Sequence, residues 1–193
     1  MDHNTNYTDS PEDNKLGLTD FSEINKVEAK GIIEAELLML EIDSNDEISV
    51  DLILRLHKVA FGPLYDWAGK WRKVRVSVGK LELPDPQRIP NLMYQFLDNL
   101  NYKIKIARTT ADVIGCLAYA HYEFVLIHPF NNGNGRLGRI VINIAALKLG
   151  YEPIDLYSRE GESRHQYISA LKAADDGNIE ALQLLIRKEL RVL

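Results

Sequence analysis

The sequence contains a single cysteine, Cys116, and this scarcity excludes several kinds of site. One thiol can form neither a disulfide framework nor a CxxC pair nor a thiolate zinc site. Cys116 stands inside an apolar run, so we interpret it as a small buried hydrophobic residue.

Long apolar runs and an excess of positive charge are also missing. No apolar stretch reaches the roughly 18 residues that a membrane span needs, and the polar, acidic start of the chain lacks the apolar segment of a signal peptide. The formal net charge is −5, which argues against binding of membranes or nucleic acids by the whole surface. We therefore expect a cytoplasmic protein with no membrane partner and no strong nucleic-acid signal.

The remaining composition describes an ordinary globular chain of 193 residues, 46% hydrophobic and 26% charged. We expect residues 1–17 to form a flexible polar arm and residues 18–193 to form one mainly helical domain. Apolar residues recur at helical spacing from about residue 20, so residues 18–42 predict a first helix. Ser49 and Gly62 are typical of the start and the end of a second one.

Residues 74–83 alternate between apolar and polar side chains, which predicts one short β-hairpin. The rest of the chain returns to helical periodicity. Its last helical stretch contains Asp176, Gly177 and Asn178, which favour the end of one helix and the start of the next. The sequence therefore predicts an all-α domain with one small hairpin.

One stretch, HPFNNGNGRLGR, joins two apolar helical segments between His128 and Arg139. The first segment ends at His128, because a residue before proline is pushed out of the α region. The loop opens at the start of the second segment, where free N–H groups and the helix dipole favour an anion. Gly133 and Gly135 allow close approach of the backbone to a ligand.

Two cations follow the glycines. Arg136 and Arg139 are three residues apart and share one face of the helix, and planar guanidinium groups suit phosphate oxygens. His128 lies at the edge of this predicted phosphate cradle, and an imidazole can take a proton from a hydroxyl near neutral pH. The combination indicates transfer of a phosphorus-centred group to an alcohol.

The stretch resembles the signature of Fic domain proteins, H-x-F-x-[D/E]-G-N-G-R-x-x-R, and meets every fixed position but one. Further landmarks of that family, among them LHKVAFG, WAGKWR and YISALKAADDGN, occur in the usual order, so the resemblance covers roughly residues 20 to 190. The chain is most similar to the group labelled mobile mystery protein B, which are compact bacterial proteins with the same departure from the signature. The resemblance implies the helical Fic fold, with the hairpin as a flap beside the active-site loop.

Fic enzymes move AMP from ATP to a Ser, Thr or Tyr hydroxyl of a protein, and the resemblance implies that activity with Mg²⁺ as cofactor. His128 would deprotonate the hydroxyl, Arg139 would hold the terminal phosphate, and Val76, Ser77 and Val78 of the flap would align the target by strand addition. The nucleotide and its phosphates would be bound by Asn131, Gly133, Asn134, Gly135, Arg136, Arg139 and Tyr167. Tyr167 could equally be a core tyrosine.

The departure from the signature is Asn132, where the family has Asp or Glu to position Mg²⁺. An amide oxygen can coordinate the ion but brings no negative charge. Two other functions therefore stay open: a catalytically weak or silent Fic fold that binds nucleotide or a partner as a regulator, and a hydrolase that removes AMP. The target, the donor and a homodimer that masks the flap are also left open.

Many Fic proteins carry an inhibitory glutamate in the pattern [S/T]-x-x-x-E-[G/N]. Thr19 and Glu23 match its spacing, but Ile24 replaces the last residue. The resemblance implies that Glu23 contacts Arg139 and blocks the terminal phosphate. The alternative is that Thr19 and Ser22 only cap the first helix.

The other histidines indicate no separate site. His121 and Glu123 resemble the H-x-E of zinc deaminases, but that chemistry also needs the two cysteines of a P-C-x-x-C motif, and this chain has one cysteine. We therefore expect His121 to pack between helices or to support the site. His57 and His165 are interpreted as structural or surface residues. The basic segment at Arg72–Val76 could touch nucleic acid, or it could be the solvated face of the hairpin.

Overall fold

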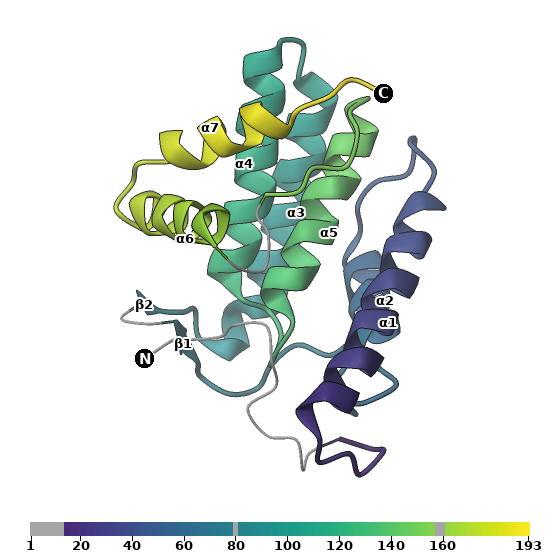
Figure 1. Cartoon of the computed structure of the whole chain (residues 1–193). Helices are drawn as coiled ribbons and strands as arrows, with labels where there is room; N and C mark the ends of the chain where they lie inside the picture. Colours follow the sequence, from purple (N-terminus) through teal and green to yellow (C-terminus); the bar gives the residue numbers. More distant parts are fainter. Residues whose placement is uncertain (1–13, 79–80, 157–160) are drawn as a thin grey trace.

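Helices dominate the computed structural model, which describes residues 14–78, 81–156 and 161–193 (Figure 1). The α-helices are α1 Phe21–Leu40, α2 Val50–Phe61, α3 Ile89–Ile106, α4 Thr110–Ile127, α5 Asn134–Lys148, α6 Glu162–Asp175 and α7 Glu180–Glu189, with a 3₁₀ turn, η2, at Pro86–Arg88. Strands β1 Ser77–Val78 and β2 Leu81–Glu82 pair antiparallel, with Ser77 opposite Glu82 and Val78 opposite Leu81. The prediction of a helical fold with one short hairpin is confirmed.

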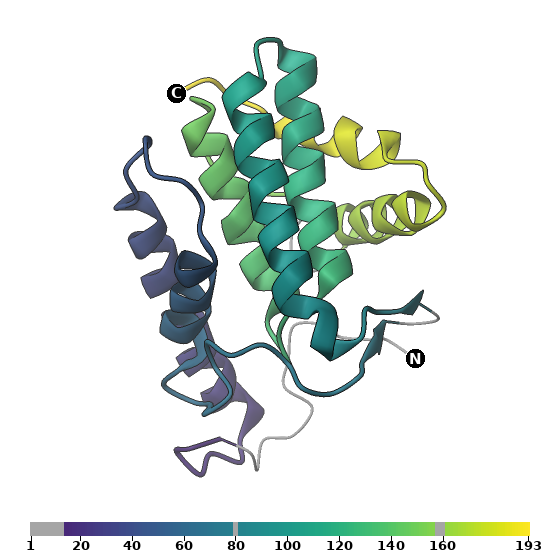
Figure 2. The same ribbon diagram turned by 180° about the vertical axis from the view of Figure 1, so that it is seen from behind.

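Helix α4 forms the centre of the domain and packs against α3, α5 and α7. Figure 2 shows α3 and α4 side by side from behind. The helix starts at a capping box, in which the Thr109 and Asp112 side chains each bond the backbone N–H of the other residue. By length and composition α4 could also cross a membrane, which corrects the expectation that no apolar run is long enough, but half of this stretch is buried inside the fold.

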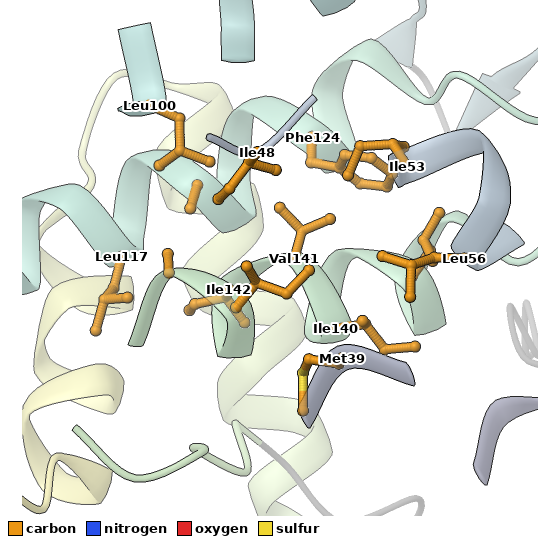
Figure 3. Packing of buried hydrophobic residues seen from close by; sticks show 14 of the residues in the cluster. Met39, Ile48, Ile53, Leu56, Leu100, Leu117, Phe124, Ile140, Val141 and Ile142 are labelled. Atoms are coloured by element: carbon orange, nitrogen blue, oxygen red, sulfur yellow. The ribbon is translucent and has the colours of Figure 1, made fainter. Parts of the chain in front are cut away.

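Helices α1 and α2 pack on each other, and α1 also contacts α5 (Figures 1 and 2). Their apolar residues meet those of the central helices in one core, where Met39 of α1 and Leu56 of α2 lie near Ile140, Val141 and Phe124 (Figure 3). This core holds fixed the end of the bundle at which α4 stops and α5 begins.

Local signals placed several boundaries correctly. Ser49 accepts a hydrogen bond from the Leu52 N–H at the start of α2, and Gly62 follows its last residue. Gly177 has a φ of 88° between α6 and α7, and the side chain of Asn178 accepts from the Glu180 N–H. The first helix starts at a different cap from those considered, because Asp20 accepts from the Ser22 N–H.

The predicted boundary of the N-terminal arm lies too late in the sequence. Asn14 is buried, and its side-chain oxygen accepts hydrogen bonds from the N–H groups of Leu16 and Leu18. The Lys15 N–H donates to the carbonyl of Leu64 at 2.7 Å. Residues 14–17 therefore pack on the domain, and the rest of the predicted arm, residues 1–13, lies outside the described residues.

Candidate active site

The segment between α4 and α5 lies at the end of the bundle that also carries the hairpin (Figure 1). His128 follows the last residue of α4 and adopts φ 50° and ψ 59°, a left-handed conformation that is uncommon for residues other than glycine. Pro129 disfavours the alternative of continuing the helix. The chain therefore leaves α4 at the residue predicted to act as the base.

The His128 imidazole is held in a state that can accept a proton. Its Nδ1 lies 3.3 Å from the carbonyl oxygen of Val125, so Nδ1–H donates there and Nε2 keeps its lone pair. Burial, together with the nearby charge of Arg72, lowers the pKa of His128 to about 4. The ring is therefore neutral at neutral pH.

The loop after His128 is closed by the side chain of Asn134. The amide oxygen of Asn134 accepts from the Phe130 N–H at 2.9 Å, and its nitrogen donates to the Phe130 carbonyl at 2.8 Å. Asn134 is only 2% exposed, so both hydrogen bonds are shielded from water. The residue predicted to bind phosphate shapes the loop through its side chain, and its backbone N–H stands in the first turn of α5.

The two loop glycines serve different needs. Gly133 has a φ of 79°, and a Cβ atom there would lie 2.4 Å from the ring of Phe61, so no larger residue fits. A Cβ atom at Gly135 would meet no atom within 4 Å. Gly133 is required by the fold, whereas Gly135 leaves the first turn of α5 open to approach from outside.

His57 supports the loop from α2. Its Nε2–H donates to the Asn132 carbonyl at 3.1 Å, its Nδ1 accepts from the Gly69 N–H at 2.9 Å, and its ring stacks on Phe130 at a centroid distance of 3.6 Å. Burial lowers the pKa of His57 to about 3. A neutral ring with one donor and one acceptor satisfies both partners, which confirms the structural role expected for His57.

Arg72 ties the hairpin to the loop. Its guanidinium donates to the carbonyls of His128, Val74 and Pro84 at 2.7, 2.8 and 2.6 Å, and its N–H donates to the carbonyl of Pro129. Only 1% of the residue is exposed. Arg72 is therefore not available to nucleic acid and does not lie on a solvated face of the hairpin, which were the two roles considered for this segment. Sequence reasoning missed the role, although Arg72 closes the WAGKWR landmark.

The two signature arginines differ in their surroundings. Arg136 forms a 2.6 Å ion pair with Glu28 of α1, and its guanidinium lies over the ring of Phe61 at 4.6 Å from the centroid. Its other nitrogens, Nε and Nη2, are buried without a hydrogen-bond partner among the described residues. Arg139 lies one turn further along α5 and is half-buried.

The glutamate that reaches this arginine is Glu28, not Glu23. Glu28 is 2% exposed and also accepts a hydrogen bond from the Tyr65 hydroxyl at 3.0 Å. Glu23 is exposed in the first turn of α1, and within the described part of the chain it forms no ion pair. The expected contact of Glu23 with Arg139 is thus corrected to one of Glu28 with Arg136.

Tyr167 belongs to the core. The residue is 4% exposed, and its hydroxyl lies 2.8 Å from Nε2 of the fully buried His121, whose Nδ1 faces the Gly138 carbonyl. Burial lowers the pKa of His121 to about 4. This supports the core reading of Tyr167 over the adenine contact. Asn131, in contrast, is exposed on the loop.

The flap residues lie at the surface. Ser77 and Val78 are exposed, Val76 is half-buried, and each strand has two residues. A strand this short and this exposed can present backbone groups to an added strand. The role of Val76, Ser77 and Val78 in docking a target stays a prediction.

The residues of the loop do not form a magnesium site of their own. The side-chain oxygen of Asn132 accepts a 2.6 Å hydrogen bond from the Gly133 N–H, and the carboxylate of Glu28 is paired with Arg136. Among the described residues, no group of three His, Cys, Asp or Glu side chains could hold a metal ion. The loop therefore offers Mg²⁺ no carboxylate ligand.

Comparisons with known proteins identify the family of this chain. The Fic/DOC family matches residues 47–146, and the chain belongs to that family. It is 33% identical over 147 residues to the protein adenylyltransferase fic-1 of Caenorhabditis elegans, covering 75% of this chain and 27% of that relative. The chain thus spans about a quarter of the length of this curated relative.

Solved structures show the same fold. Residues 134–508 of Fic-1 from C. elegans superpose with a TM-score of 0.74 at 28% identity, covering 89% of this chain and 50% of that one. The N-terminal Fic domain of a VirB-translocated effector from Bartonella quintana, solved with bound ADP, gives a TM-score of 0.72 at 19% identity and covers 100% and 96% of the two chains. The narrower resemblance to the mobile mystery protein B group stays a prediction.

Proposed function

We propose that this chain transfers AMP from ATP to a hydroxyl side chain of a protein. The observation that carries the proposal is the neutral His128 imidazole, with Nε2 free to accept a proton, at the edge of the open first turn of α5. The C. elegans relative is named a protein adenylyltransferase, which supports the same reaction.

In the proposed step, Nε2 of His128 takes the proton of the target hydroxyl while the hydroxyl oxygen attacks the α-phosphorus of ATP. The bond from that phosphorus to the oxygen bridging to the β-phosphate breaks, and pyrophosphate leaves with the electron pair. Backbone N–H groups of the first turn of α5, which have no intrahelical acceptor, would face the phosphates together with Arg139. Any Mg²⁺ would enter with the nucleotide, because the loop supplies no carboxylate.

The test uses the full chain with ATP labelled on the α-phosphate, with and without Mg²⁺. We expect label on protein from the wild type and none from His128→Ala. Nucleotide binding is measured separately by calorimetry for both proteins. Equal labelling by wild type and His128→Ala would refute His128 as the base.

We further propose that Glu28 restrains the site in the state described. The pair with Arg136 occupies one guanidinium nitrogen, and the other two are buried without a partner, so this cation cannot meet a phosphate until α1 shifts. Glu28→Gln removes the charge and keeps the shape, and we expect higher labelling and tighter nucleotide binding. Glu23→Gln, an exposed change on the same helix, is the matched control and should behave as wild type.

A silent, nucleotide-binding regulator is the second candidate. The Asn132 side chain, whose oxygen is already engaged by the Gly133 N–H, favours it. ATP binding without any label transfer, from both the wild type and Glu28→Gln, would support this candidate over the transferase.

A further inference from the structure

The ion pair between Glu28 and Arg136 is made through one pair of atoms. Nη1 of Arg136 donates to Oε2 of Glu28 at 2.6 Å, while Nε and Nη2 of the same guanidinium are buried and have no hydrogen-bond partner among the described residues. Arginine and carboxylate groups bind most strongly through two parallel hydrogen bonds, and a buried pair must also offset the loss of water around both charges. The contact with Arg136 alone therefore accounts poorly for the position of Glu28.

The second oxygen of Glu28 is held from the turn that follows α2. The Tyr65 hydroxyl donates to Oε1 of Glu28 at 3.0 Å, and a hydrogen bond to a charged group is stronger than one between neutral groups. Both residues are shielded from water, since Tyr65 is 0% and Glu28 2% exposed. Loss of this donor would leave the carboxylate less well satisfied at a place where water cannot replace the hydroxyl.

Tyr65 itself is held in one position. Its ring stacks on Trp67, with the centroids 4.5 Å apart and the planes 10° apart. Its N–H donates to the carbonyl of Phe61 at 3.0 Å, and the carbonyl of the preceding residue, Leu64, accepts from the Lys15 N–H at 2.7 Å. The hydroxyl is therefore presented to α1 from a fixed ring.

Helix α1 is also held against α2 close to Glu28. A Cβ atom at Gly31 would lie 2.0 Å from the carbonyl oxygen of Ala60, so the backbones of the two helices are in direct contact at this point. Gly31 follows Glu28 by three residues, and residues three apart share one face of a helix. The contact therefore fixes α1 along α2 at the height at which the Glu28 carboxylate reaches Tyr65.

We propose that Tyr65 is the positioning residue of the restraint: its hydroxyl holds the Glu28 carboxylate on Arg136 and so sets how often this arginine can meet a phosphate group. The proposal rests on the restraint by Glu28 proposed above. When the carboxylate moves away, the guanidinium is released for an anion. The apparent affinity for a phosphate-bearing ligand then rises with the fraction of molecules in the released state.

Tyr65→Phe tests the proposal, because it removes the hydroxyl and keeps a ring that can stack on Trp67. We expect ATP, titrated by calorimetry without a target protein, to bind on the order of tenfold more tightly than to the wild type. The matched control is Tyr122→Phe, which removes another tyrosine hydroxyl that donates to a carboxylate, that of Asp175, at 3.2 Å. This control should leave the ATP affinity unchanged.

A double-mutant cycle with Glu28→Ala shows whether Tyr65 acts through Glu28. Glu28→Ala should raise the ATP affinity at least as much as Tyr65→Phe does, and the double variant should bind ATP no more tightly than Glu28→Ala. Urea unfolding of the same proteins verifies that each is folded. It also measures the coupling between the two side chains in the absence of nucleotide.

The outcomes separate this proposal from the restraint on which it rests. If Tyr65 had only a structural role, Tyr65→Phe would lower the free energy of unfolding and keep the wild-type ATP affinity, while Glu28→Ala bound ATP more tightly. That result would overturn the proposal, as would gains in ATP affinity that add in the double variant. Unchanged ATP affinity in Glu28→Ala would overturn the restraint itself and this proposal with it, whereas the transfer reaction is tested separately through His128.

Discussion

The signature loop and the hairpin flap lie at the same end of the bundle but are built in opposite ways. The loop backbone is held by buried side chains, because the amide of Asn134 bonds both backbone groups of Phe130 and the Nε2–H of His57, on α2, donates to the Asn132 carbonyl. The flap has two-residue strands, and the side chains of Ser77 and Val78 are exposed. The group that would do chemistry is fixed, and the surface that would meet a partner is left open.

The difference shows how one end of a helical bundle can combine a rigid loop with an adaptable edge. Satisfied buried polar groups fix one conformation, because every alternative leaves a donor or acceptor unpaired. Exposed strands lose little when they shift, because water replaces their partners. Arg72 is the bridge between the two regions, since its guanidinium binds carbonyls of both.

Removing that bridge should have the largest effect. Arg72→Ala leaves the carbonyls of His128, Val74 and Pro84 without their donor, and we expect a loss of at least about 3 kcal/mol in the free energy of unfolding. Urea denaturation measures it. The control is Arg75→Ala, which breaks a largely exposed ion pair with Asp85 and should cost far less, because water screens exposed charges. Similar losses in both variants would contradict the bridging role.

Alanine substitutions at Gly133 and Gly135 should separate an effect on folding from an effect on ATP binding. Gly133→Ala meets the Phe61 ring and an unfavourable positive φ, so we expect a destabilisation of about 2–4 kcal/mol. Gly135→Ala fits without contact and should leave stability unchanged or raise it by up to about 1 kcal/mol, while it weakens ATP binding by filling the approach to the helix start. Unfolding and calorimetry are compared on the same samples. Unchanged ATP affinity in Gly135→Ala would show that the phosphates bind elsewhere.

Three buried neutral histidines should make the fold less stable in acid. The pKa values of His57, His121 and His128 are lowered from 6.5 to about 3, 4 and 4, so below pH 6.5 the unfolded chain binds protons that the folded chain does not. The free energy of unfolding should therefore fall as the pH drops from about 6.5 towards 4, by up to a few kcal/mol for each histidine. Urea denaturation along this pH range checks the slope, and His121→Gln should reduce it. A flat profile would show that the rings are not held neutral.

A substitution in the flap should have the smallest effect on the free energy of unfolding, and it should reduce the transfer of label without changing ATP binding. Ser77→Pro removes a backbone N–H from an exposed two-residue strand, so we expect a change within about 0.5 kcal/mol in the free energy of unfolding. Transfer of label to protein should fall, while ATP affinity stays at the wild-type value. The side-chain control Glu82→Lys keeps the N–H group and should retain transfer. Normal transfer by Ser77→Pro would show that targets do not add a strand here.

Many helix boundaries could be predicted from short stretches of sequence. Helix ends at Ser49, Gly62 and Gly177 could be read from neighbouring residues, because a cap or a positive φ depends on a few bonds within one turn. The end of α4 at His128 followed in the same way from Pro129. The place of the loop and the need for Gly133 could therefore be predicted before any packing was known, and the role of His128 as base stays a prediction.

The partners of that loop were decided only by tertiary structure. Glu23 fits a sequence pattern, but five residues turn a helix by about 140° beyond a full turn, so Glu23 and Glu28 face different directions. The packing of α1 on α2 and α5 sets which of them meets Arg136, a residue 108 positions away in the chain. The same holds for Arg72 and Tyr167, because the rotation of one packed element against another is fixed by the whole core and not by the local spacing of residues.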